Sequence, residues 1–197
     1  MEAHLRHYAL PCLMAGLTVG GQLAAHPWGG SPMIAYATYA GAFVPMRFSV
    51  LSTILISLLN DIVVHFVFFP NFAIFGWSTL SVCIALTLNT LLATLTVKGR
   101  NYVIWALPTA LFSSVVFFAV TNFGSWLALS YTKTWAGLMD SYTMAIPFWR
   151  NQVIFTASFT ILFFGLHKLH ELFASRREQK DEYVTLKTPD SSTVCEA

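Results

Sequence analysis

The sequence has very little charge. Only 10% of its 197 residues are Asp, Glu, Lys or Arg, whereas 56% are hydrophobic and 15% aromatic. A soluble domain usually carries about 25% charged residues. The formal net charge is only +2, so the sequence lacks the basic surface that nucleic-acid binding requires. The shortage of charge indicates an integral membrane protein and argues against nucleic acid as a partner.

The sequence also lacks residue patterns typical of disulfides, metal sites or catalytic sites. The three cysteines, Cys12, Cys83 and Cys195, show no paired spacing, which argues against disulfides and a metal site. The sequence contains no H-E-x-x-H, G-x-S-x-G or P-loop motif. No nucleophile–base pair is visible either. We therefore expect no enzymatic activity, no metal and no cofactor.

Long apolar runs dominate the sequence instead. A chain in lipid must satisfy its backbone groups internally, as a helix or a closed barrel, and these runs lack the period-two alternation of barrel strands. The sequence therefore predicts an all-α polytopic membrane protein, a bundle of six helices. The six predicted segments are residues 8–25, 33–46, 48–69, 72–97, 102–122 and 147–169.

Two of these segments need comment. The first lacks a convincing signal-peptide cleavage site, so we interpret it as a membrane span; cleavage would leave five spans. The second is short, follows the Gly/Pro-rich "HPWGGSP" and holds Pro45 near its end. We expect this second helix to be tilted or to cross the membrane incompletely.

Basic residues indicate the orientation. If the N-terminus is cytoplasmic, nine of the eleven Lys and Arg residues lie inside and only Lys133 and Arg150 lie outside. Such a positive-inside bias predicts cytoplasmic termini, in a plasma or inner membrane. Residues 174–197 are polar without apolar periodicity, so we predict a six-helix transmembrane domain over residues 1–173 and a disordered cytoplasmic tail after it.

The third segment carries polar residues at helical spacing. Ser49, Thr53, Ser57 and Asn60 follow one face of a helix. Asn60 lies twelve residues after Phe48, about 18 Å along a helix, and so past the membrane midplane toward the outside. The pattern predicts a polar stripe that reaches the outer leaflet.

Asp61 is the one acidic residue within a predicted span, and His65 lies one helical turn beyond it. An intramembrane carboxylate is costly and should face protein, water or a partner. One interpretation is a group that binds a ligand or couples an ion. The other is a structural acid paired with His65 or Arg150. For His65, a solvated interfacial histidine is the alternative to a binding role.

More hydrogen-bonding groups gather at the same level. Asn122 ends the fifth segment, and Arg150 and Asn151 begin the sixth. These groups, with Asn60, are candidates for contacts to a solute. Polar side chains also join helices to one another, and an arginine at this depth also anchors a helix at the headgroups, so both structural alternatives stay open.

The connection between the fifth and sixth segments is rich in aromatic residues. The aromatic residues in and next to this connection fit an interfacial belt, the commonest role of such residues; they are Trp126, Tyr131, Trp135, Tyr142 and Trp149. Residues 134–144 also have helix-compatible composition. We expect them to form a short outer lid over a pocket, with Trp28 in the first outer loop as a second cover.

The first segment has small residues at four-residue spacing. Gly16, Gly20 and Ala24 fall on one helix face, and this spacing lets another helix approach closely. The partner helix belongs either to this chain or to another subunit.

Several of these stretches carry a family resemblance. "TNFGSWL", "YTKTWAGLMDSYTMAIPFWRN", "HPWGGSPMIAYATYAGAF" and "LLNDIVVHF" resemble an uncharacterised family of bacterial six-helix integral membrane proteins over about residues 27–165. That family in turn resembles the substrate-capture (S) components of energy-coupling factor transporters, in size, helix number and hydropathy.

The resemblance implies a function. S components bind vitamins or related small molecules from outside, beneath the loops after helices one, three and five. They dock through small residues of helix one to a transmembrane coupling subunit driven by ATPases; that motif is usually Ala-based, whereas two of the three positions here are glycine.

We therefore expect a membrane component that captures a small polar, vitamin-like or heterocyclic solute. The alternative is a ligand-free structural or assembly subunit. The expected solute contacts are Asn60, Asp61, His65, Asn122, Arg150 and Asn151, with Trp28, Trp126, Trp135 and Tyr142 as stacking or capping residues.

Overall fold

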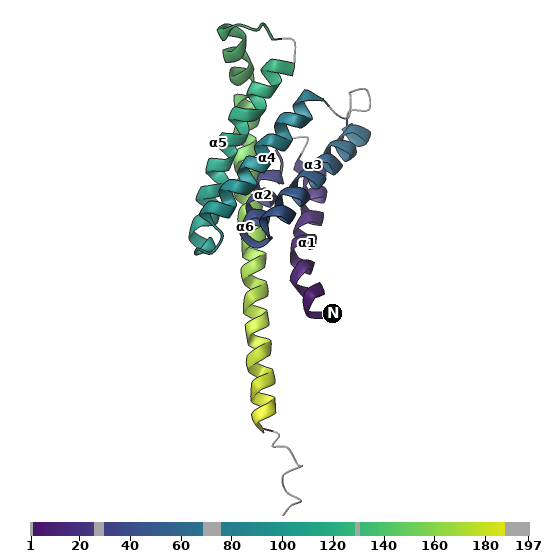
Figure 1. Ribbon diagram of the computed structural model, residues 1–197, viewed down its shortest axis with the longest axis vertical. Helices are drawn as coiled ribbons and strands as arrows, with labels where there is room; N and C mark the ends of the chain where they lie inside the picture. Colours follow the sequence, from purple (N-terminus) through teal and green to yellow (C-terminus); the bar gives the residue numbers. More distant parts are fainter. Residues whose placement is uncertain (1, 26–29, 69–75, 129–130, 188–197) are drawn as a thin grey trace, which may run out of the picture. The chain divides into compact units, whose positions relative to one another are not determined.

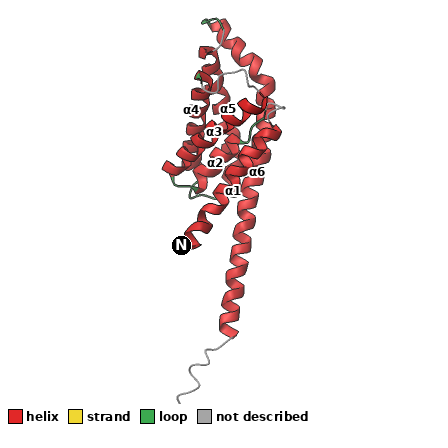
Figure 2. Ribbon diagram, turned by 90° about the vertical axis from the view of Figure 1, so that its right-hand side faces the viewer, coloured by secondary structure: helices red, strands yellow, loops and turns green. Residues whose placement is uncertain are grey.

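The computed structural model describes residues 2–25, 30–68, 76–128 and 131–187 (Figures 1 and 2). These residues form helices and no strand, which confirms the predicted all-α class. The helices are α1 (Glu2–Ala25), α2 (Met33–Phe43), α3 (Met46–Phe68), α4 (Trp77–Thr96), α5 (Tyr102–Ala128) and α6 (Trp135–Lys187). The chain divides into two compact units, Met1–Phe164 and Gly165–Ala197.

Among the described residues, four helices are long and apolar enough to cross a membrane. The stretches that qualify are Met46–Val67, Trp77–Thr96, Tyr102–Ala128 and Trp135–Arg177. The apolar part of α1, Ala9–Leu23, is shorter. Helix α2 has only 11 residues, about 16 Å at 1.5 Å per residue, which is too short for a hydrocarbon core of about 30 Å. The prediction of a short second helix is therefore confirmed.

Helix α2 forms the centre of the first unit, and Figure 1 shows the larger helices around it. Every residue from Met33 to Ala42 is buried. The helix ends where Val44 adopts an extended conformation (φ −102°, ψ 145°) before Pro45, because a residue that precedes proline is sterically driven out of the helical region.

A glycine lets α2 lie directly on α4. A Cβ added to Gly41 would lie 2.5 Å from the Thr90 carbonyl oxygen and 2.8 Å from Ala93 Cβ. The Thr94 hydroxyl donates to the Gly41 carbonyl at 3.2 Å. The two backbones therefore approach as closely as a missing side chain allows, a common form of packing between membrane helices.

Aromatic rings fill the space at the C-terminal end of α2. The Tyr39 ring centroid lies 5.0 Å from that of Phe43 and 6.3 Å from that of Phe163 on α6. The Phe43 centroid lies 5.2 Å from that of Tyr102 at the start of α5. Tilted and edge-on ring pairs at such distances are favourable, so this cluster joins α2, α5 and α6.

Two contacts fix α4 and α5 as antiparallel neighbours. The hydroxyls of Thr96 and Thr109 are 2.9 Å apart near the turn between the helices. Near the other end, a Cβ on Gly124 would overlap Ser81. The residue numbers therefore rise along α5 as they fall along α4, and the buried faces of both helices meet along their length.

The predicted polar stripe of α3 is buried. Ser49 and Thr53 are fully buried, and Ser57 and Asn60 nearly so. The Thr90 hydroxyl of α4 lies 3.3 Å from that of Thr53. The stripe therefore faces protein, as expected for polar side chains in an apolar helix.

The predicted lid is not a separate helix. Residues 134–144 were expected to form a short outer helix before a sixth span, whereas Trp135–Lys187 is one helix with Pro147 inside it. Thr134 starts this helix, because its hydroxyl accepts from the Gly137 N–H at 3.3 Å and its carbonyl from the Leu138 N–H at 3.0 Å. Membrane helices tolerate an internal proline because neighbouring groups satisfy the freed carbonyl.

The C-terminal region also differs from the prediction. Disorder was expected from residue 174, but α6 continues to Lys187. Residues 174–187 contain no Gly or Pro and are rich in strong helix formers. Within the second unit, Glu171 lies 3.1 Å from Lys168 and 3.5 Å from His167, and ion pairs at this spacing support a helix.

Candidate binding site

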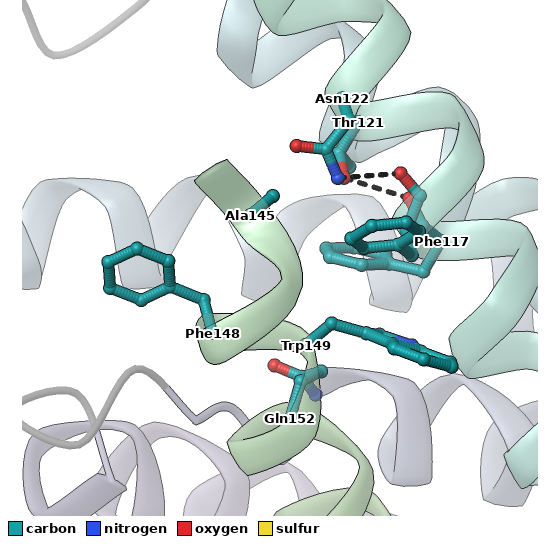
Figure 3. Close-up of a pocket in the computed structure, with 8 residues that line it drawn as sticks. Phe117, Thr121, Asn122, Ala145, Phe148, Trp149 and Gln152 are labelled. Carbon is teal, nitrogen blue, oxygen red and sulfur yellow. Dashed lines mark hydrogen bonds between the residues drawn. The ribbon is translucent and has the colours of Figure 1, made fainter. Parts of the chain in front are cut away.

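A pocket of about 260 Å³ lies between α5 and the first part of α6 (Figure 3). Its walls carry aromatic rings, small apolar side chains, one hydroxyl and two amides, and none of them is charged. The lining residues are Phe117, Phe118, Thr121, Asn122, Ala145, Phe148, Trp149 and Gln152.

Two of the three side-chain donors on the α5 wall are already used. Asn122 Nδ2 donates to the Phe118 carbonyl and Thr121 Oγ1 donates to the Phe117 carbonyl, both at 2.8 Å. Each bond reaches back four residues along α5. Thr121 thus uses its one donor, and Asn122 one of its two N–H groups, within their own helix.

The donors on the α6 wall are also used. Gln152 Nε2 donates to the Ser31 carbonyl at 2.8 Å and to Thr156 Oγ1 at 3.1 Å. Trp149 Nε1 donates to Ser114 Oγ on α5 at 3.1 Å. These bonds hold the pocket wall in place and leave its N–H groups occupied.

The amide oxygens remain available. A backbone carbonyl only accepts hydrogen bonds, so the amide atoms beside the Phe118 and Ser31 carbonyls must be nitrogens. In the described part of the chain, no group donates to Asn122 Oδ1 or to Gln152 Oε1. Figure 3 shows the Asn122 oxygen pointing away from its own helix. The pocket thus offers two amide acceptors and, as a donor, the second N–H of Asn122.

Aromatic side chains form the rest of the wall. The Phe118 centroid lies 5.2 Å from that of Trp149 and 5.5 Å from that of Tyr142. The Tyr142 hydroxyl donates to the Ala119 carbonyl at 2.6 Å. Tyr142 therefore contacts Phe118 and bonds to α5 but does not line the pocket. Ring faces of this kind attract flat or cationic groups.

Of the predicted solute contacts, Asn122 is in this pocket. Arg150 is exposed and Asn151 half-buried on α6, and neither lines it. Trp126 lies farther along α5, where its Nε1 donates to the Thr132 carbonyl at 2.9 Å. Trp135 is 74% exposed at the start of α6. Trp28 lies outside the described residues.

The predicted α3 residues lie elsewhere. Asn60 is 4% exposed, and its Nδ2 is 2.7 Å from Met33 Sδ at the start of α2. Asp61 has Thr79 of α4 as its hydrogen-bonding neighbour. Within the described residues, no ion pair joins Asp61 to His65 or to Arg150. The predicted contacts on α3 therefore do not share a site with Asn122, the one predicted contact that lines the α5–α6 pocket.

Sequence reasoning missed several residues of the pocket. Gln152 is an amide within an apolar segment, which was a usable signal, and Trp149 was interpreted only as part of the interfacial belt. Asn89 of α4 was also missed. It is fully buried, and neither end of its amide has a partner within the described residues.

The predicted docking face on α1 is open. Gly16 and Gly20 are exposed, and a Cβ added to either would meet nothing within 4 Å. Ala24 belongs to the same helix. No described helix of this chain packs against the two glycines.

Comparison with known proteins gives one match. A family described as a family of unknown function, DUF6580, matches residues 2–179. No curated protein and no solved structure matches the chain. Because the match covers most of the sequence, this membrane protein belongs to the DUF6580 family.

Proposed function

We propose that this protein captures a small organic solute in the pocket between α5 and α6. One observation supports the proposal most strongly. No described residue donates to the amide oxygens of Asn122 and Gln152, whereas most N–H donors of the wall are bonded to protein. A ligand N–H that donates to either oxygen forms a hydrogen bond that the protein itself does not supply.

The wall also defines the class of solute. It has two amide acceptors, aromatic faces and no charged side chain. A solute with N–H donors and a flat apolar body satisfies all three features. A neutral N–H heterocycle or an aromatic amine fits, whereas a carboxylate or phosphate finds no cation in the wall. This class of solute is narrower than the vitamin-like or heterocyclic class expected from the sequence.

Transport is the second part of the proposal. Its support is the resemblance of the sequence to energy-coupling S components, together with the positive-inside bias, which favours cytoplasmic termini and a pocket on the outer side of the membrane. A transmembrane coupling subunit with ATPases would then use the open face at Gly16 and Gly20. No chemical conversion of the solute forms part of this function.

Binding can be tested with defined probes. Purified protein in mild detergent is titrated with benzimidazole, aniline and benzoate, and binding is measured by native mass spectrometry. We expect benzimidazole or aniline to bind and benzoate not to bind. Preferential binding of benzoate would contradict the proposed acceptor site.

Two variants locate the site. Asn122→Leu removes one acceptor and should weaken binding by about three- to tenfold, the usual effect of losing one neutral hydrogen bond. Thr143→Val is the matched control, because its exposed hydroxyl donates only to the Met139 carbonyl of its own helix. Equal affinities in both variants would remove the α5–α6 pocket as the site.

The second candidate function is that of an assembly subunit without a ligand. The open glycine face of α1 favours it, since a close-packing surface is left uncovered. In that case, gently purified protein retains another subunit but no small molecule. The double variant Gly16→Leu/Gly20→Leu should then lose the subunit.

A further inference from the structure

A second cavity, separate from the α5–α6 pocket, opens between α1, α2 and α3. Its volume is about 370 Å³. Tyr36, Val44 and Ile56 form a buried floor, and the half-exposed side chains of Phe48, Leu51 and Leu55 form one wall. Phe48 and Leu55 are seven residues apart, so the groove follows α3 for about 10 Å.

This groove offers nothing to a polar ligand. The only side-chain oxygens in its lining belong to Tyr36 and Ser52. Ser52 lies beside Tyr36 and donates to the Ser49 carbonyl at 3.0 Å. The rest of the surface is hydrocarbon, apart from the thiol of Cys12. An occupant of this groove is therefore apolar along its length.

Two basic residues stand at one end of the groove. The Arg47 guanidinium carbon lies 4.9 Å from the centroid of the Phe48 ring, which lines the groove. Lys98 Nζ is 3.4 Å from the carbonyl oxygen of Val44, which lines it too. Both side chains are exposed. Within the described residues neither forms an ion pair, so both charges are available to an external anion.

The depth of these residues in the membrane matters. Arg47 is the second residue of the apolar stretch Met46–Val67, and Lys98 follows the stretch Trp77–Thr96. Residues at the ends of membrane spans lie at the level of the lipid headgroups, and the groove runs from there along α3 toward the hydrocarbon. Cations at headgroup depth beside an apolar groove are the arrangement that a phospholipid complements.

We propose that this groove binds an anionic phospholipid. One acyl chain lies along Leu51 and Leu55 over the floor formed by Tyr36 and Val44. The phosphate and the anionic headgroup contact Arg47 and Lys98. The site is independent of the proposed solute pocket, which lies between other helices and carries no charge.

Native mass spectrometry tests the proposal on the full-length protein. The protein is titrated with dioleoyl-phosphatidylglycerol and, separately, with dioleoyl-phosphatidylcholine. We expect one phosphatidylglycerol to bind more tightly than phosphatidylcholine. Arg47→Gln and Lys98→Gln should each weaken that binding by about fivefold, the effect of one basic group near an anionic lipid.

Two further variants separate a site from general attraction. Arg100→Gln removes the same charge from the same end of the bundle, but the Arg100 side chain lies over Trp105 rather than at the groove. It should change affinity less than twofold. Leu51→Trp fills the groove at a half-exposed position and should weaken binding of both lipids.

Three results would overturn the proposal. The first is equal affinity for the two lipids. The second is an Arg100→Gln effect as large as that of Arg47→Gln, which would indicate only nonspecific attraction. The third is unchanged lipid binding in Leu51→Trp.

Discussion

Gln152 on α6 donates a hydrogen bond at 2.8 Å to the carbonyl of Ser31, a residue 121 positions earlier in the chain. Ser31 lies two residues before the start of α2, so this bond joins the entrance of the central helix to the wall of the α5–α6 pocket. Gln152 is only 8% exposed. A single amide thus holds the site to the core of the bundle.

Replacing this amide should destabilise the protein. Gln152→Leu leaves the Ser31 carbonyl without its donor, which should lower the free energy of unfolding by about 1–3 kcal/mol. Thermal unfolding in detergent measures the change. Ser158→Ala is the control, because that exposed hydroxyl donates only to the Ile154 carbonyl one turn away. Equal melting temperatures for the two variants would show that the bond to Ser31 contributes nothing.

Gly41 and Gly16 should respond oppositely to the same substitution. Gly41→Ala places a Cβ 2.5 Å from a backbone oxygen of α4, which must move, so we expect a loss of about 1–3 kcal/mol. Gly16→Ala meets nothing within 4 Å and should gain up to about 1 kcal/mol from helix propensity. Unfolding by a graded denaturing detergent compares the two. A neutral Gly41→Ala would mean that α2 and α4 are not in backbone contact.

The buried Asn89 amide should lower the stability of the folded protein. It is fully buried with both amide atoms unpaired, so Asn89→Leu should stabilise the protein by about 1–3 kcal/mol. Thr90→Val is the comparison, because that hydroxyl donates to the Leu86 carbonyl at 2.9 Å and should not be dispensable. If Asn89→Leu instead destabilises the protein, the amide has a partner such as a buried water.

The orientation of the helices can be tested by labelling. The native cysteines are replaced by serine, and single cysteines are placed at the exposed positions Thr132 and Asn101. With cytoplasmic termini, a membrane-impermeant maleimide should label Thr132→Cys in intact cells and Asn101→Cys only after permeabilisation. The reverse pattern would place the α5–α6 pocket on the cytoplasmic side and end the proposal of capture from outside.

The sequence predicted local features well. The polar stripe from Ser49 to Asn60 was visible because its spacing repeats every three or four residues, and all four of its residues are buried. The short second helix was visible because Gly and Pro flank it. Such features depend on a few neighbouring residues, so the sequence contains all that is needed to find them.

Two local predictions failed for a related reason. Pro147 was interpreted as a boundary and residues 174–187 as disordered, yet both lie inside α6. In each case a general preference was overruled. A membrane helix tolerates proline, and a polar stretch without Gly or Pro remains helical.

The sequence by itself determined that this chain is a helical membrane protein, because apolar length and the cost of unpaired backbone groups leave few alternatives. The tertiary structure alone decided which polar groups share a site. Asp61 and Asn122 were expected together, but Asp61 neighbours Thr79 while Asn122 faces Trp149 and Gln152 across a pocket. Depth along a helix can be counted from the sequence, whereas the direction of a side chain depends on how the helices pack around α2.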